Sequence, residues 1–408
     1  MGRPSVLGII LAGGRGERLY PLTRDRSKPA VPFGGKYRII DFILSSLLNS
    51  GIDAIYVLVQ YKSQSLIEHL RAAWRLGGRL KGSFITVVPP QFRQGERWYR
   101  GTADAVYQNL NLIRDFRPDL VAIFGADHIY RIDTTQMVDF HLRREADVTV
   151  ATLPVPLAQA TRFGIVKVGA DERVVGFAEK PKRPEPMPQD PQMAYASMGS
   201  YLFNREILKD ALNRDARRDT EHDFGKSVLP DLYPDASVYA YDFFKNEIPG
   251  LKPYEERGYW RDIGDIEAYW KAHMALLGPT PVFDLENRVW PILAEAYDGP
   301  PCRIFGGKIS NSMIGEGGTV RGAKITRSIL GKAVQIERGA QIEDAILFDH
   351  VEVGAGARLR KVIIDRFNTI KPGEEIGYDL EKDKANFTVG PSGVVVLPRG
   401  ETRFFYKG

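Results

Sequence analysis

A glycine-rich segment near the start of the chain carries the residue types that bind a polyphosphate. Gly13, Gly14 and Gly16 lie close together, with Arg15 between them and Arg18 just beyond. Glycine backbones adopt positive φ and approach a ligand closely, so that successive N–H groups can surround an anion. Arginine adds a planar set of donors that matches phosphate oxygens. This pattern predicts a polyphosphate-binding loop.

A lysine follows this loop in a stiffened segment. Lys28 begins the sequence KPAVP, in which two prolines restrict the backbone beside the lysine. Two familiar phosphate loops do not match, because the Walker pattern needs Gly-Lys-Ser/Thr and the dinucleotide pattern needs glycine where this chain has Leu19. A tight turn with solvated arginines is the alternative, but three basic residues grouped with the glycines favour an anion site.

Two aspartates could bind a metal ion beside this loop. Asp127 follows the apolar run 120–124, and Asp262 lies close to Gly264 in the sequence YWRDIG. Ligands of open α/β sheets bind at the carboxyl ends of the strands, and Mg²⁺ uses one or two carboxylates together with phosphate oxygens of the substrate. An aspartate at a strand end is more often a cap or turn residue. The metal site therefore depends on the two acids meeting in space.

Two further segments carry groups that could bind a substrate. Glu179 and Lys180 follow the strand-like run 174–178 and could hold a sugar hydroxyl and a phosphate; a solvated charge pair before a turn is the alternative. A helix could begin after Gly101, with Thr102 as its cap.

Alternating strand-like and helix-like runs must position these residues. Apolar runs at 5–11, 54–59, 120–124 and 147–152 alternate with helical patterns such as that at 65–70. Such alternation is typical of an α/β domain with a Rossmann-like, mostly parallel sheet and helices on both faces. The proline-rich sequence PKRPEPMPQDPQ, which follows Lys180, is expected to be an extended surface excursion.

The pattern changes after about residue 300. Aliphatic residues recur at every sixth position and the unit repeats after 17 residues, as in Leu330, Ile336, Ile342, Leu347, Val353 and Leu359. This is typical of hexapeptide repeats in a left-handed parallel β-helix, with an antiparallel sandwich as the alternative. A short stack leaves its terminal coils uncovered, so we expect it to end against the first domain or another subunit.

We therefore expect three parts in this 408-residue chain. Residues 1–275 form the α/β domain that carries the candidate polyphosphate loop, 276–300 a linker, and 301–408 the β-helix.

The net charge, the cysteine count and the length of the apolar stretches indicate which kinds of partner and compartment this chain suits. The net charge of +5 is mild for this length and the basic residues form no run, which favours small anionic ligands over nucleic acid. A single cysteine, Cys302, excludes an internal disulfide and fits a reducing compartment. Apolar stretches stay far shorter than the roughly 20 residues that span a bilayer, and no signal peptide pattern opens the chain. We expect a cytoplasmic protein without a membrane partner.

Over essentially its full length the chain resembles the glucose-1-phosphate adenylyltransferases (ADP-glucose pyrophosphorylases), a branch of the sugar-nucleotide pyrophosphorylases. The glycine loop and the KPA sequence belong to the broad superfamily. More specific are GGKYRIIDF, WYRGTADA, ASMG, HDFG and YWRD. The resemblance implies that ATP and α-glucose 1-phosphate react to give ADP-glucose and pyrophosphate, the activation step of glycogen or starch synthesis.

The resemblance also implies roles for individual residues. Arg15 would hold the β- and γ-phosphates, Lys28 would support the nucleotide phosphates, and Asp127 and Asp262 would bind Mg²⁺. Lys180 would clamp the phosphate of glucose 1-phosphate. The remaining residues would lie against the nucleotide (Gly13, Gly14, Gly101) or line the sugar pocket (Tyr99, Gly164, Glu179, Ser197).

Regulation is implied in the same way. Members of this family are commonly homotetramers controlled by phosphorylated metabolites, and the β-helix resembles their regulatory and assembly domain. Arg38 matches a position implicated in effector binding, but Asp25 stands where several regulated relatives have lysine, and an acid would repel a phosphorylated activator. Arg26 and Arg38 could instead form a different anion site with arginines of the β-helix, namely Arg358, Arg360 and Arg366.

Three alternatives stay open at this point. One is a sugar-1-phosphate nucleotidyltransferase that uses another nucleotide. Another is a non-catalytic regulatory subunit, although such a protein has no chemical reason to keep the arginine, the lysines and the aspartates named above. The third is a binding protein built on the β-helix. Acetyl transfer by the β-helix is disfavoured, because its only histidine is His350.

Overall fold

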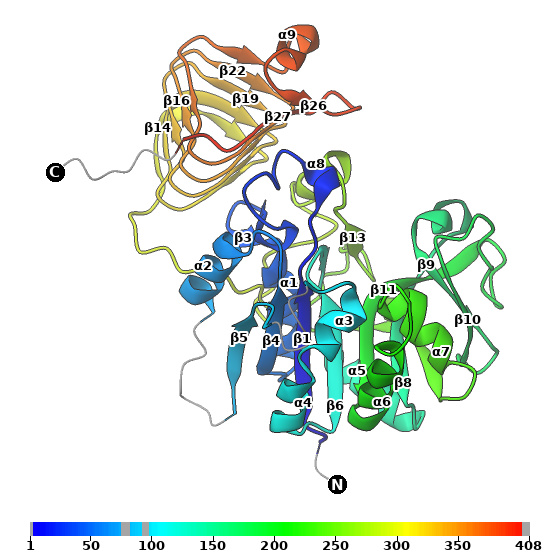
Figure 1. Cartoon of the computed structure of the whole chain (residues 1–408). Helices are drawn as coiled ribbons and strands as arrows, with labels where there is room; N and C mark the ends of the chain where they lie inside the picture. The colour runs from blue at the N-terminus through cyan, green and yellow to red at the C-terminus, as the bar shows by residue number, and fades with distance from the viewer. Residues whose placement is uncertain (1–2, 75–81, 92–97, 402–408) are drawn as a thin grey trace.

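The computed structural model describes residues 3–74, 82–91 and 98–401. An N-terminal α/β unit holds a central sheet, and a C-terminal β-helix lies beyond the carboxyl ends of the sheet's parallel strands (Figure 1). The segment 275–302 between them contains neither helix nor strand. It includes the expected linker 276–300, whose boundaries stay a prediction.

Four parallel strands form the half of the sheet that carries the glycine loop. Their order is β5-β4-β1-β6, with bounds β1 (Val6–Ala12), β4 (Ala54–Val59), β5 (Phe84–Val88) and β6 (Leu120–Gly125). The almost continuous burial of β1 fits a central strand that is covered on both faces. Its side chains alternate between two cores, with Leu7 and Ile9 in one and Ile10 and Ala12 in the other.

The long strand β11 (Met193–Asn204) changes the direction of the sheet. It runs antiparallel to β6, β8 and β9. The other strands of this half are β8 (Val148–Pro156), β9 (Gly164–Val168), β10 (Val174–Glu179) and β12 (Val238–Asp242). The mostly parallel α/β fold is confirmed, and the reversal at β11 is a feature that the strand-like runs did not predict.

Helices cover both faces of the sheet, as expected. Buried side chains of one group pack on the Ile10 face: α1 (Ile39–Asn49), α2 (Gln64–Ala73) and α5 (Thr134–Arg143). Those of a second group pack on the Leu7 face: α3 (Thr102–Tyr107), α4 (Leu110–Phe116), α6 (Arg205–Asp215) and α7 (Leu229–Leu232). The proline-rich segment 181–192 forms neither helix nor strand, which confirms that expectation.

The C-terminal unit is a parallel β-helix with the predicted 17-residue repeat. Ile329 pairs with Ile346 and Ile346 with Ile363, and the other two sides of the coil repeat with the same spacing. The central coils of the β-helix contain the strands β17 (Ile329–Leu330), β18 (Gln335–Ile336), β19 (Gln341–Glu343), β20 (Ile346–Leu347), β21 (Glu352–Val353), β22 (Arg358–Arg360) and β23 (Val362–Ile364).

The β-helix contacts the α/β unit along a side of the stack. Ile329, Ile346 and Ile363, one above another, share a core with α8 (Ile266–Met274). The first strand of the stack, β14 (Arg303–Ser310), is exposed along its length except at Ile309. The expected packing on the first domain is thus present, while the first coil is left open.

Candidate active site

The glycine loop follows β1 and presents Arg15 to solvent. Gly16 has φ 66°, and a Cβ at this position would lie 2.9 Å from Lys28 Cβ, so glycine satisfies both the backbone and the close approach of the lysine. The Arg15 side chain is 72% exposed, 3.6 Å from Glu17 and 5.7 Å from the centroid of the Tyr61 ring. Its guanidinium is therefore accessible to a phosphate.

Lys28 joins the two predicted metal-binding acids. It begins the short helix η2 (Lys28–Ala30), and its side chain is buried. The ammonium Nζ lies 3.2 Å from Asp127 Oδ2 and 3.4 Å from Asp262 Oδ1. The two aspartates therefore meet, which the sequence alone did not establish.

Two very short strands bring these acids together. Asp127 lies between β6 and β7 (His128–Tyr130), and Asp262 is the last residue of β13 (Trp260–Asp262). Strands β7 and β13 pair antiparallel, with Asp262 opposite His128. The pairing carries the second acid to the carboxyl end of β6, where ligands of such sheets bind.

Electrostatics keep Asp127 ionised. Desolvation by burial acts to raise the pKa of Asp127. The cationic form of His128, present at the low pH where this carboxyl titrates, and the ammonium of Lys28 outweigh that effect and hold the pKa below its ordinary range. His128 Nδ1 lies 3.1 Å from Asp127 Oδ1, and burial lowers the pKa of this imidazole. At neutral pH the site thus presents a carboxylate and a neutral histidine.

The two carboxylates fit a divalent metal ion that also binds substrate oxygens. Their oxygen atoms converge on one ammonium, and Mg²⁺ is commonly held by one or two carboxylates plus phosphate oxygens. Among the residues that the structure describes, no group of three or more His, Cys, Asp or Glu side chains could hold a metal ion by itself. A metal at Asp127 and Asp262 would therefore need the nucleotide to complete its ligands.

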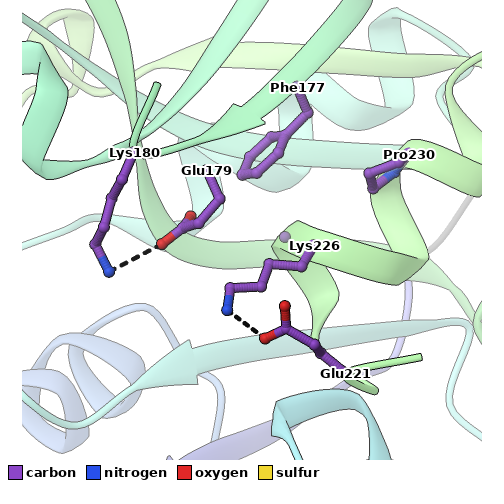
Figure 2. Close-up of a pocket in the computed structure, with 7 residues that line it drawn as sticks. Phe177, Glu179, Lys180, Glu221, Lys226 and Pro230 are labelled. Carbon is purple, nitrogen blue, oxygen red and sulfur yellow. Dashed lines mark hydrogen bonds and ion pairs between the residues drawn. The ribbon is translucent and has the colours of Figure 1, made fainter. Parts of the chain in front are cut away.

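A cavity of about 420 Å³ lies at the end of β10 (Figure 2). Phe177, Glu179 and Lys180 line one side, and Glu221 and Lys226 line the other. Lys180 Nζ lies 3.1 Å from Glu179 Oε1, and each lysine points toward its own carboxylate. Two cations and two carboxylates in a polar cavity suit a phosphorylated, hydroxyl-rich ligand.

Gly164 and Ser197 lie next to this cavity. Gly164 faces Glu179 across the β9–β10 pair, and a Cβ there would lie 2.8 Å from Glu179 Oε2. Glycine at this position leaves room for the carboxylate. Ser197 follows Ala196, which pairs with Ile165, so the serine comes beside Gly164.

Tyr99 is held by a residue that the sequence interpretation missed. Gln60 Oε1 accepts a hydrogen bond from Tyr99 N (2.7 Å), and Gln60 Nε2 donates to Tyr99 O (3.3 Å). A Cβ on Gly13 would lie 3.4 Å from Gln60 Cβ, so the glutamine connects the glycine loop with Tyr99. Its position directly after the buried strand β4, like that of Asp127 after β6, was the signal that could have identified it.

Close packing against His222 leaves no room for a side chain at Gly101. A Cβ would lie 2.3 Å from the carbonyl oxygen of His222, which accepts a hydrogen bond from Ala103 N (2.8 Å). The helix begins here as predicted, but the expectation that Thr102 caps it was wrong. Thr102 is its first residue, and its hydroxyl instead donates to Asp223 Oδ2 (2.8 Å).

Arg26 is buried against the β-helix. Arg26 Nη2 lies 2.9 Å from Asp365 Oδ1, and both side chains are 1% exposed. Arg38 lies 3.7 Å from Asp349, and burial together with the charges of Arg38 and Arg26 lowers the pKa of Arg366 to about 9. Three of the five arginines proposed for an anion site therefore come together.

Arg358 and Arg360, the other two arginines of the expected anion site, lie elsewhere. Arg358 and Arg360 belong to β22, in a different sheet of the β-helix from β23, which precedes Arg366. Arg358 pairs with Glu375 at 2.6 Å. Asp25 lies 3.1 Å from Arg24 Nε, so the acid at this position already has a cationic neighbour.

A second cavity, of about 250 Å³, lies between the α/β unit and the β-helix. Arg38 and Lys36 line it from the first unit and Lys332 from the second. Lys36 lies 3.2 Å from Glu316, and Lys332 lies 3.2 Å from Glu295. Three cations face this cavity, each beside a carboxylate that an incoming anion could replace.

Comparison with known proteins agrees with this two-part architecture. A nucleotidyl transferase family model matches residues 7–278, and a model of a GlmU-like C-terminal hexapeptide domain matches residues 303–397, consistent with a left-handed β-helix. The chain is 53% identical to a glucose-1-phosphate adenylyltransferase of Thermodesulfovibrio yellowstonii over 97% of this chain and 96% of the relative. Relatives of the same name from Thermus thermophilus (49%, covering 98% and 99%) and Photobacterium profundum (47%, covering 97% and 98%) are similar. No helix in the described part of the chain is long and apolar enough to cross a membrane.

Proposed function

The chain belongs to the glucose-1-phosphate adenylyltransferase family, and we propose that its glycine loop, Lys28 and paired aspartates form the centre where ADP-glucose is made. It is a nucleotidyltransferase that converts ATP and glucose 1-phosphate into ADP-glucose and pyrophosphate. The observation that best supports the assignment of residues is the convergence of Asp127 and Asp262 on one ammonium beside the loop.

The reaction is an in-line substitution at the α-phosphorus of ATP. A phosphate oxygen of glucose 1-phosphate forms the new P–O bond, the bond to the β-phosphate bridge oxygen breaks, and its electron pair leaves with pyrophosphate. No general base is needed, because the attacking oxygen is already charged. The main barrier is repulsion between two polyanions, which Arg15 and Lys180 offset by holding the β,γ-phosphates and the sugar phosphate respectively.

The metal site supports the same step. Nucleotidyltransferases generally use a divalent metal ion, and we propose Mg²⁺ at Asp127 and Asp262. When bound, such an ion stabilises charge on the α-phosphate and the leaving group. Lys28, between the two carboxylates, orients them and supports the nucleotide phosphates. Gly13, Gly14 and Gly101 would lie against the nucleotide.

The hexose part of the substrate belongs in the cavity at the end of β10. Glu179 would accept hydrogen bonds from sugar hydroxyls, while Tyr99, Gly164 and Ser197 complete the wall around them. The proximity of Gly164 to the Glu179 carboxylate supports this placement.

Phosphorylated effectors would act at the contact between the two units. We propose that Arg38, together with the cations of the 250 Å³ cavity, receives the effector, and that Arg26 couples this site to the β-helix through Asp365. Because Asp25 replaces a lysine of several regulated relatives, a response to the usual sugar phosphate activators is expected to be weak. Kinetics that do not change with any phosphorylated metabolite would contradict this regulatory proposal.

Assembly and location follow from the family. We propose a homotetramer, for which the open first coil offers apolar contacts at Ile304 and Phe305, each more than half exposed. Light scattering tests the assembly. We also propose that the enzyme acts in the cytoplasm, where ATP and glucose 1-phosphate are available, at the start of glycogen or starch synthesis.

The deciding assay is pyrophosphate release with glucose 1-phosphate and Mg²⁺, comparing ATP with UTP, dTTP and GTP. We expect a strong preference for ATP. Activity with another nucleotide would keep the mechanism and move the enzyme to another sugar-nucleotide pathway. Absence of release in every sample would instead favour a non-catalytic regulatory subunit.

A further inference from the structure

Two lysine–glutamate pairs face each other across the cavity at the end of β10. Lys180 with Glu179 forms one pair, and Lys226 with Glu221 forms the other (Figure 2). The first pair is used by the proposed function. The second pair has no role so far, although its members line the same space.

The second pair is mounted on a firmly held segment. Lys226 lies in the π-helical turn η4 (Phe224–Val228), a rare element that is frequent at functional sites. Asp223 Oδ1 accepts hydrogen bonds from Gly225 N (2.9 Å) and Lys226 N (3.1 Å), and its other oxygen accepts from Thr102. The backbone that carries Lys226 is therefore fixed relative to α3.

Stability does not explain this ion pair. The Lys226 and Glu221 side chains are 39% and 66% exposed, and exposed pairs of this kind contribute little to folding. The hydrogen bond to Glu221 raises the pKa of Lys226, so the ammonium remains protonated at neutral pH. It is a permanent donor whose three N–H groups are only partly used by Glu221.

The surrounding charges indicate which part of a sugar phosphate this pair would meet. Three carboxylates, those of Glu221, Asp223 and Glu179, lie near the ammonium of Lys226, and their negative charge raises its pKa. Their combined negative charge opposes the approach of a phosphate dianion but not of a neutral hydroxyl. A lysine beside a glutamate also offers a donor and an acceptor close together, which suits neighbouring hydroxyls.

We propose that Lys226 and Glu221 bind hydroxyl groups of the hexose, on the wall opposite Glu179 and Lys180. Lys226 donates to one hydroxyl oxygen, and Glu221 accepts from that hydroxyl or its neighbour. The pair thereby contributes to selection of the hexose, while Lys180 holds the phosphate. This inference rests on the proposed sugar site.

The test compares Lys226→Met with the wild-type enzyme on glucose 1-phosphate and on its 2-, 3-, 4- and 6-deoxy analogues. We expect kcat/KM for glucose 1-phosphate to fall about 10- to 100-fold, the usual effect of losing a hydrogen bond to a charged group, with the KM for ATP unchanged. For the analogue that lacks the contacted hydroxyl, the kcat/KM values of Lys226→Met and the wild type should differ by less than about threefold. Glu221→Gln, which keeps the size of the side chain, should show a smaller loss of the same pattern.

A matched control is Lys209→Met, which removes the lysine of an exposed pair with Glu206 on α6, outside the cavity. It should behave as wild type. Normal activity of Lys226→Met, or a loss equal for all four analogues, would overturn the inference. An inactive wild-type enzyme would instead contradict the proposed function, so the two failures are distinguishable.

Discussion

Asp127 and Asp262 both form an ion pair with the ammonium of Lys28, at 3.2 and 3.4 Å respectively. The pairing of β7 with β13 produces this convergence, and the glycine loop lies directly beside it because Gly16 packs on Lys28. A phosphate chain bound by the loop would therefore come within reach of both acids. The arrangement makes the role of each residue separately testable.

Replacement of Asp127 by asparagine should abolish most turnover. The change keeps the shape of the side chain but removes the charge that would hold Mg²⁺, and loss of one such interaction typically costs about 10²-fold or more in kcat. Steady-state pyrophosphate release at saturating Mg²⁺ measures it, with an unchanged circular dichroism spectrum as evidence of folding. Asp139→Asn, an exposed position on α5, is the matched control. Near-normal activity of Asp127→Asn would refute the metal role.

Replacement of Lys180 by alanine should act mainly on the sugar substrate. Lys180 is 63% exposed, and within the part of the chain that the structure describes it forms an ion pair with Glu179 alone, so the fold does not depend on it. We expect the KM for glucose 1-phosphate to rise about tenfold or more, with little change in the KM for ATP. Lys182→Ala, in the exposed segment that follows, serves as control. An unchanged KM for glucose 1-phosphate would show that the assignment is wrong.

These two predictions depend on residues that sequence patterns identify well. The glycine loop, the lysine after it and the acid after a buried strand are local features, and the 17-residue repeat of the β-helix is a regular one. The meeting of Asp127 with Asp262 was not predictable, because it depends on two strands of three residues each, too short for any periodicity. The same holds for Lys226 and for the burial of Arg26, since both depend on contacts between segments far apart in the chain.

A buried histidine under the β-helix should make stability depend on pH. His273 Nε2 accepts a hydrogen bond from Gly34 N (3.2 Å), and burial lowers the pKa of His273 to about 3. The unfolded chain has an ordinary histidine pKa of about 6.5, so below that pH the unfolded state binds one more proton than the folded state. The contribution of His273 is therefore complete above pH 6.5 and declines as the pH falls toward 3.

Between pH 7 and pH 5 this histidine should remove about 2 kcal/mol from the free energy of unfolding. Denaturation by urea at both pH values measures the loss. His273→Gln keeps a side chain that can accept from Gly34 but cannot be protonated, so its loss over the same range should be smaller by about that amount. Equal losses in the variant and the wild type would contradict the prediction.

The buried pair of Arg26 and Asp365 should be the most sensitive point of contact between the two units. Arg26→Met leaves the Asp365 carboxylate buried without its cation, which typically costs about 3–5 kcal/mol. Adding Asp365→Asn removes the uncompensated charge, so the double variant should recover much of the loss even though it restores no ion pair. Urea denaturation of the wild type, both single variants and the double variant gives the coupling energy.

Arg24→Met, next to Asp25 on the exposed side of the same segment, should change stability by less than about 1 kcal/mol. If the two single losses simply add in the double variant, Arg26 and Asp365 do not stabilise the contact as a pair.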